Sequence, residues 1–140
     1  MKRKSLKALI EWKNNSKRKP LILTGARQVG KTYILKAFAS SNFKKAHYVN
    51  FEEDAQLIKI FDKNLDTKRI VTELCFYLDS AINLKEDLII FDEIQACPKA
   101  LTSLKYFQER HESIYLCAAG SLLGLQLSKS AFPVGKVDFL

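Results

Sequence analysis

The chain has 140 residues, of which 47% are hydrophobic and 27% charged, a composition typical of one globular domain and not of a disordered chain. Its longest apolar runs fall far short of the ~20 residues that cross a bilayer, and the apolar stretch after the basic start is too brief for a signal peptide. We therefore expect a cytoplasmic protein with no membrane partner. Three cysteines without a CxxC pair predict neither a disulfide framework nor a zinc site.

The net charge of +8 is concentrated at the N-terminus. Residues 1–20 contain eight Lys or Arg against the single acid Glu11, hence +7. We predict a basic N-terminal helix over residues 1–19, with Leu6, Leu9, Ile10 and Trp12 on its apolar face, followed by a core over residues 20–140. Either the lysines and arginines of this helix are simply solvated, or they contact a nucleic-acid backbone or an acidic partner.

Short apolar runs alternate with helix-like stretches along the core, which is typical of a parallel sheet built from β–α units. We expect strands at residues 21–24, 48–51, 88–91 and 114–118, the last continuing to Gly120-Ser121, and a fifth strand beginning near residue 134. Helices are expected at residues 31–40, at 57–61, from an Asp66 or Thr67 cap to about 82, and from Pro98 onward. The predicted fold class is α/β.

The first expected strand leads into a glycine-containing loop that matches the pattern G-x-x-x-x-G-K-[ST]. The loop reads Gly25-Ala26-Arg27-Gln28-Val29-Gly30-Lys31-Thr32. Its glycines allow a tight turn whose backbone N–H groups face inward, and the following helix adds its positive N-terminal end, so the loop favours phosphate. Lys31 is expected to reach the β- and γ-phosphates, and the Thr32 hydroxyl to bind Mg²⁺.

The third expected strand ends in two carboxylates, Asp92 and Glu93. Open parallel sheets place their sites at such strand ends. We expect Asp92 to hold Mg²⁺, an ion that prefers oxygen ligands and retains water, and Glu93 to act as the base for a water that attacks the γ-phosphate. The glutamate favours hydrolysis over phosphoryl transfer to a small-molecule acceptor.

Two further polar residues are candidates for the same site. Ser121 follows the fourth strand and either orients the attacking water or caps the next helix. Gln95 either helps to order the pocket or is an ordinary turn residue.

The blocks GARQVGKT, YVNFEED, LIIFDEIQACP, AAGSLLG and FPVGKVDFL resemble successive blocks of a prokaryotic AAA-type ATPase family, from Leu6 to Leu140. The resemblance implies a P-loop NTPase core with three α/β/α layers and strand order 5-1-4-3-2. It assigns residues 25–32 to the Walker A loop and Asp92 and Glu93 to the Walker B motif. It also assigns Gly120-Ser121 to the sensor region and matches Gln95 to a recurrent position. Because members of the family are longer, we expect this chain to be a truncated N-terminal part with an incomplete fifth strand.

The main functional prediction is therefore ATP binding and Mg²⁺-dependent ATP hydrolysis, with turnover by the truncated chain less well supported than binding. One alternative is a nucleotide-binding switch or remnant that does not hydrolyse ATP. Another is a nucleotide-regulated nucleic-acid-binding module, suggested by the basic N-terminal segment. The expected partner is a nucleoside triphosphate, and a homo-oligomer is left open.

Overall fold

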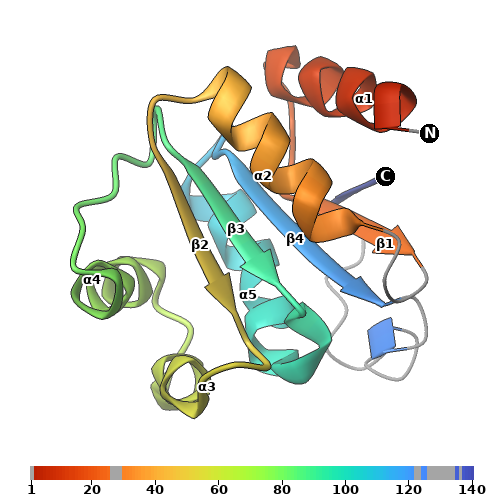
Figure 1. Ribbon diagram of the computed structural model, residues 1–140. Helices are drawn as coiled ribbons and strands as arrows, with labels where there is room; N and C mark the ends of the chain where they lie inside the picture. Colours follow the sequence, from red (N-terminus) through yellow and green to blue (C-terminus); the bar gives the residue numbers. More distant parts are fainter. Residues whose placement is uncertain (1, 26–29, 122–123, 126–134, 136) are drawn as a thin grey trace.

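The computed structural model describes residues 2–25, 30–121, 124–125, 135 and 137–140 (Figure 1). It is an α/β fold in which helices cover both faces of a single five-stranded sheet. The predicted fold class is confirmed.

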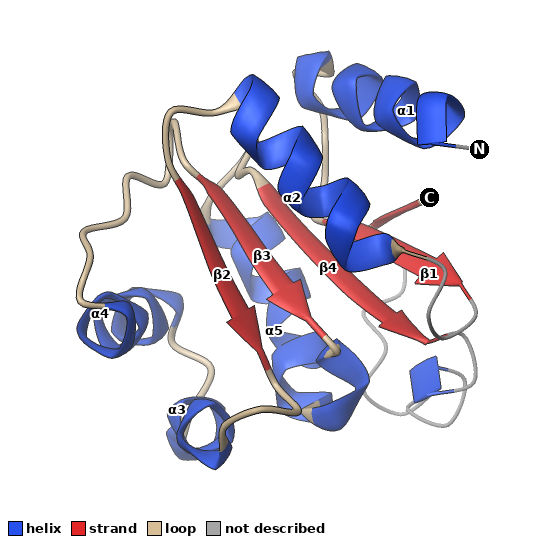
Figure 2. Ribbon diagram, viewed as in Figure 1, coloured by secondary structure: helices blue, strands red, loops and turns tan. Residues whose placement is uncertain are grey.

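The strands of the sheet all run in the same direction, as the arrowheads of the four labelled strands in Figure 2 illustrate. They are β1 (Leu21–Gly25), β2 (Ala46–Asn50), β3 (Leu88–Asp92), β4 (Leu116–Ser121) and β5 (Asp138–Phe139). Their order is β2-β3-β4-β1-β5. This is the expected order 5-1-4-3-2 taken from the opposite edge, so the topology prediction is also confirmed.

The helices form two layers with separate apolar cores. One layer holds α1 (Lys2–Asn14) and α2 (Lys31–Asn42), and the other holds α3 (Ala55–Lys63), α4 (Thr67–Leu78), the short 3₁₀ helix η1 (Ile94–Ala96) and α5 (Pro98–Arg110). Because β3 is buried along its whole length, its side chains supply both cores: Phe91 packs on the α5 side and Ile90 on the α2 side. A strand covered on both faces reads as a continuous apolar run.

Helix boundaries follow local capping chemistry. The side chains of Asp54 and Asp66 accept hydrogen bonds from the second backbone N–H of α3 and α4, as N-cap residues do. Pro98 occupies the first turn of α5, where its missing N–H costs nothing. The expected extension of α4 to about residue 82 is wrong, because Asp79 takes a left-handed conformation with φ 51° and ends the helix after Leu78.

The boundaries of β1 to β4 differ from expectation by one or two residues, and β1 and β3 each extend one residue further, to Gly25 and Asp92. β2 begins at Ala46 and ends at Asn50, so Phe51 lies in the following turn, although its N–H still donates to the Asp92 carbonyl at 3.1 Å. β4 begins at Leu116, not at residue 114. The expected start of the fifth strand, residue 134, lies outside the described residues, and β5 pairs with Leu21 and Ile22 of β1.

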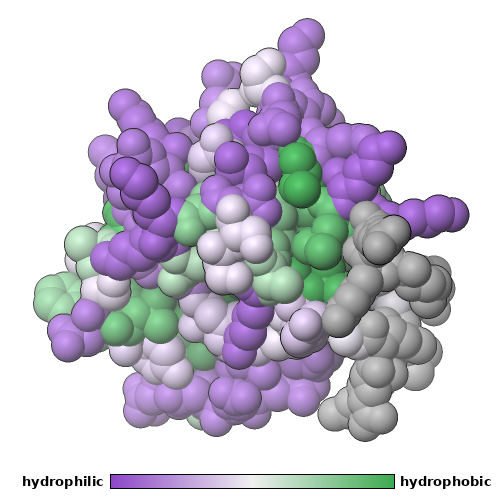
Figure 3. All heavy atoms as spheres, turned by 45° about the horizontal axis from the view of Figure 1, so that its top comes forward, coloured by the Kyte–Doolittle hydropathy of each residue, from purple (hydrophilic) through white to green (hydrophobic). Residues whose placement is uncertain are grey.

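The N-terminal helix packs on α2. Leu9 and Trp12 are buried, and the Trp12 ring meets Phe38 and Tyr115 edge-on. The placement of Ile10 on the same apolar face is wrong, because its side chain is exposed. Hydrophilic residues nevertheless cover most of the face in Figure 3, with a smaller hydrophobic area in its middle. The separation of a basic segment at residues 1–19 from a core at 20–140 stays a prediction. Within the described part of the chain, no helix is both long enough and apolar enough to cross a membrane.

A buried hydrogen bond between side chains links the start of β2 to the turn before β3. The Nε2 atom of His47 lies 2.9 Å from Oδ2 of Asp87, and the same oxygen accepts the backbone N–H of Asn83 at 2.9 Å. Burial alone would raise the pKa of the Asp87 carboxyl, but these hydrogen bonds outweigh it and hold the pKa below its usual value.

This pair should make stability depend on pH. The folded pKa of Asp87 lies below the unfolded value of about 3.9, so the carboxylate stabilises the fold at neutral pH and loses this contribution as the pH falls below about 4. We expect Asp87→Asn to lower the free energy of unfolding by about 1–3 kcal/mol at pH 7 and by less at pH 3, measured by urea denaturation across that range. A difference in the free energy of unfolding between variant and wild type that stays constant with pH would contradict this account.

Candidate functional site

The parallel sheet brings the predicted chemistry to one edge. Gly25 ends β1, Asp92 ends β3 and Ser121 ends β4, and because the strands are parallel their carboxyl ends lie together. β4 lies between β1 and β3, with Gly25 in register with Ser121. Segments far apart in the sequence thereby meet around the start of α2.

The Asp92 carboxylate is the centre of this edge. It is 1% exposed, and its Oδ2 accepts the hydroxyl of Thr32 at 2.6 Å. Its other oxygen, Oδ1, accepts the backbone N–H of Glu93 at 2.9 Å. A buried carboxylate needs such donors, because an unpaired buried charge is strongly destabilising. The contact joins the two residues that the sequence predicts to bind Mg²⁺.

Tyr48 of β2 is a third donor, which the sequence analysis missed. Its hydroxyl donates to the same Oδ2 of Asp92 at 2.5 Å, and the Lys36 ammonium lies 4.2 Å from its ring centroid. Burial, together with the hydrogen bond to Asp92, raises the pKa of Tyr48 above its ordinary value, so the hydroxyl keeps its proton. A tyrosine two residues before the end of a strand carries little signal unless the pairing of β2 with β3 is known.

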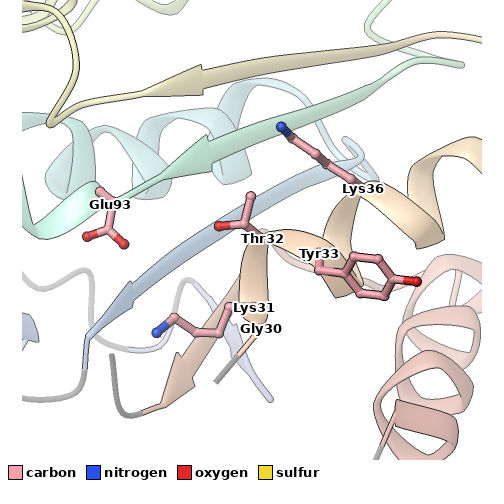
Figure 4. Close-up of a pocket in the computed structure, with 6 residues that line it drawn as sticks. All are labelled: Gly30, Lys31, Thr32, Tyr33, Lys36 and Glu93. Carbon is pink, nitrogen blue, oxygen red and sulfur yellow. The ribbon is translucent and has the colours of Figure 1, made fainter. Parts of the chain in front are cut away.

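Lys31 and Thr32 open α2 beside a cavity of about 500 Å³. Gly30, which precedes the helix, has φ +80°, a conformation that strains any residue with a Cβ. The Lys31 side chain is 8% exposed, and its Nζ lies 3.4 Å from the Gly25 carbonyl oxygen. Figure 4 shows Lys31, Thr32 and Glu93 among the six residues that line this cavity. The N-terminal end of α2 favours an anion here.

Glu93 lies on the wall of this cavity in an unusual backbone conformation. Its φ is 51° and its ψ 45°, in the left-handed region, which costs a residue other than glycine on the order of 1–3 kcal/mol. The conformation turns the chain from β3 into η1. One carboxylate oxygen, Oε2, accepts a hydrogen bond from Nε2 of Gln95 at 2.8 Å.

Ser121 serves as a cap in the structure. Its Oγ accepts the backbone N–H of Gly124 at 3.1 Å, the bond expected of a residue that precedes a helical turn. This contact matches one of the two roles expected for Ser121, and orientation of a water stays a prediction. Four other loop positions predicted to bind nucleotide, Ala26, Arg27, Gln28 and Val29, lie outside the described residues.

The donor set of this edge fits Mg²⁺. Thr32 and Asp92 offer oxygen atoms, and Mg²⁺ is held in proteins by few side-chain oxygens together with water and substrate phosphate. In the part of the chain that the structure describes, no cluster of three or more His, Cys, Asp or Glu residues is arranged to hold a metal ion.

The bond from Tyr48 should stabilise the chain even without nucleotide. We expect Tyr48→Phe to lower the free energy of unfolding by about 1.5–3 kcal/mol, the usual contribution of a hydrogen bond to a charged group, measured by urea denaturation. Tyr106→Phe, which removes the same atom from α5 in the opposite layer, is the matched control. Equal losses in the two variants would show that the Tyr48–Asp92 bond adds nothing of its own.

Comparison with known proteins places the chain in a family. No curated protein matches the sequence significantly. The family model described as AAA domain matches residues 17–140, which include every predicted site residue. AAA domains bind nucleotides and are of the ATPase type, in agreement with the parallel sheet and the grouped strand ends. The chain belongs to the AAA domain family.

Proposed function

We propose that this domain binds ATP and hydrolyses it in a Mg²⁺-dependent reaction. The observation that carries the proposal is the 2.6 Å hydrogen bond from the Thr32 hydroxyl to the buried Asp92 carboxylate. Thr32 lines a cavity together with Lys31 and Glu93. A lysine, a hydroxyl and a carboxylate at the start of a helix are the groups that hold a nucleoside triphosphate and its metal ion in P-loop enzymes.

Binding in this proposal uses the whole loop at residues 25–32. Its backbone N–H groups and the N-terminal end of α2 bind the phosphates, and the Lys31 ammonium neutralises the β- and γ-oxygens. The Thr32 hydroxyl and the Asp92 carboxylate hold Mg²⁺, the carboxylate through water. When bound, that ion neutralises charge on the phosphate oxygens. Tyr48 keeps its hydrogen bond to Asp92 and fixes the orientation of the carboxylate.

Hydrolysis in this proposal uses Glu93 as the base. Its carboxylate accepts the proton of the attacking water, and the hydroxyl of Ser121 orients that water from the end of β4. Positioning and charge neutralisation supply most of the rate acceleration in phosphoryl transfer, so the base must be held in place. Its left-handed backbone and its hydrogen bond to Gln95 support this role.

The main alternative is a nucleotide-binding switch that does not turn over. It uses the same phosphate site and differs only in the rate of phosphate release. A nucleic-acid-binding role is supported by the charge of residues 1–20 alone. Arg18 does not contribute to such a surface, because it is 8% exposed and its guanidinium donates to the carbonyl oxygens of Lys13, Asn15 and Ser113. A homo-oligomer and a cytoplasmic location stay predictions.

Nucleotide binding should raise thermal stability. A ligand at ~100 times its dissociation constant stabilises the native state by roughly 2.7 kcal/mol, so Mg·ATP should raise the Tm of the wild-type chain. Lys31→Ala should abolish the shift, because it removes the cation that faces the phosphates, and Lys85→Ala, in the turn before β3, should keep it. A folded wild-type chain whose Tm does not respond to Mg·ATP would contradict the proposed binding function.

Hydrolysis is tested separately by Glu93→Gln. The substitution keeps the size of the side chain and removes the base, so we expect Mg·ATP binding to persist while phosphate release falls by on the order of 10²- to 10⁴-fold. The readouts are the thermal shift and inorganic phosphate release on the same samples. Saturable binding without any release by the wild type would select the switch, and unchanged release by the variant would remove Glu93 as the base.

A further inference from the structure

Gln95 lies in η1, two residues after Glu93, and its side-chain amide joins three strand ends. Its Nε2 donates to Oε2 of Glu93 at 2.8 Å and to Oε1 of Glu52, just beyond β2, at 3.3 Å. Its Oε1 is buried against β4, where a Cβ at Gly120 would lie 2.7 Å away. The amide therefore lies among the segments that follow β2 and β3 and the last residues of β4.

The orientation of this amide follows from its surroundings. Two carboxylates, Glu52 and Glu93, face one end of the group, so that end must be the NH₂, which has only donors. The oxygen then faces the β4 side, and it has no hydrogen-bond partner among the described residues. A buried acceptor without a partner costs about 1–3 kcal/mol. The donor contacts to the carboxylates therefore hold the side chain in an otherwise unfavourable position.

Two glycines provide the space for this side chain. A Cβ at Gly124 would lie 2.4 Å from Cγ of Gln95, and one at Gly120 would lie 2.7 Å from its Oε1. Both distances are shorter than van der Waals contact allows. Gly120 lies in β4 and its φ is outside the positive range, so the requirement for glycine there is one of space and not of backbone conformation.

We propose that Gln95 is the positioning residue of Glu93, and that the close packing of its side chain against Gly120 and Gly124 couples the end of β4 to the position of that carboxylate. The inference rests on the proposed function, because it gives Glu93 the role of base. A movement of the segment at Gly120–Ser121 pushes on the amide of Gln95, and the amide carries the movement to Glu93. The segment beside the end of β1 thereby controls whether the base is aligned.

The first test is a double-mutant cycle in the chain without nucleotide. Gly120→Ala should lower the Tm when Gln95 is present, because the new methyl group displaces the amide. In a Gln95→Ala background the same substitution should cost much less, since the amide that it meets is gone. Equal losses of Tm in the two backgrounds would overturn the coupling between β4 and Gln95.

The second test separates binding from turnover. Gln95→Glu keeps the length of the side chain, loses the donor and puts a third carboxylate beside Glu52 and Glu93. We expect kcat for ATP to fall by on the order of 10- to 100-fold, the usual effect of displacing a catalytic group by about 1 Å, while KM stays close to that of the wild type. Gln108→Glu, on α5, is the matched control and should leave kcat unchanged. A wild-type kcat in Gln95→Glu would overturn the positioning role.

Glu93→Gln, measured alongside Gln95→Glu, separates the proposed role of Glu93 as the base from the proposed positioning role of Gln95. If Glu93→Gln loses turnover and Gln95→Glu does not, Glu93 remains the base and only the positioning role fails. If Glu93→Gln keeps turnover, the base is misassigned and the positioning role fails with it. If the wild-type chain does not turn over, the nucleotide-free cycle with Gly120 decides the coupling by itself.

Discussion

The hydrogen bond between Thr32 and Asp92 is the contact on which the rest of the site depends. It joins the first turn of α2 to the end of β3 at a carboxylate that is 1% exposed. Removing a buried carboxylate from water is expensive, and the cost is met only if several donors converge on it. Here the donors come from α2, from β2 and from the backbone of Glu93. The same contacts at Asp92 therefore hold α2 against the sheet and form the site.

The strand order explains why such a contact forms at all. With β4 between β1 and β3, the ends of β1 and β3 at Gly25 and Asp92 lie on either side of the end of β4. After β3, the left-handed backbone conformation of Glu93 turns the chain into η1. From η1, the side chain of Gln95 donates a hydrogen bond to the carboxylate of Glu93. The topology brings the groups together, and local backbone conformation sets the directions in which they point.

Much of this arrangement could be predicted from the sequence. The apolar runs at residues 21–23 and 88–91 made both strands identifiable. Lys31 and Thr32 follow from the loop pattern, and Asp92 and Glu93 from the strand end taken together with that loop. Tyr48 was not predictable, because its role depends on the register of β2 with β3, and a one-residue shift would turn it to the other face. The end of α4 was missed because Asp79 adopts a conformation that asparagine and aspartate tolerate but do not require.

The contacts of Arg18 have a consequence for anyone who shortens the chain. Its guanidinium stacks on the Tyr115 ring, 3.7 Å from the centroid, and donates to the Ser113 carbonyl just before β4. The segment that carries most of the positive charge therefore also stabilises the domain, through the contacts of Arg18 with Tyr115 and Ser113. A truncation made to ask whether that charge attracts nucleic acid would loosen the domain at the same time, and lost affinity would be uninterpretable. Replacing the exposed lysines Lys4, Lys7 and Lys17 by glutamate removes most of the +7 charge of residues 1–20 and leaves the contacts of Arg18 intact.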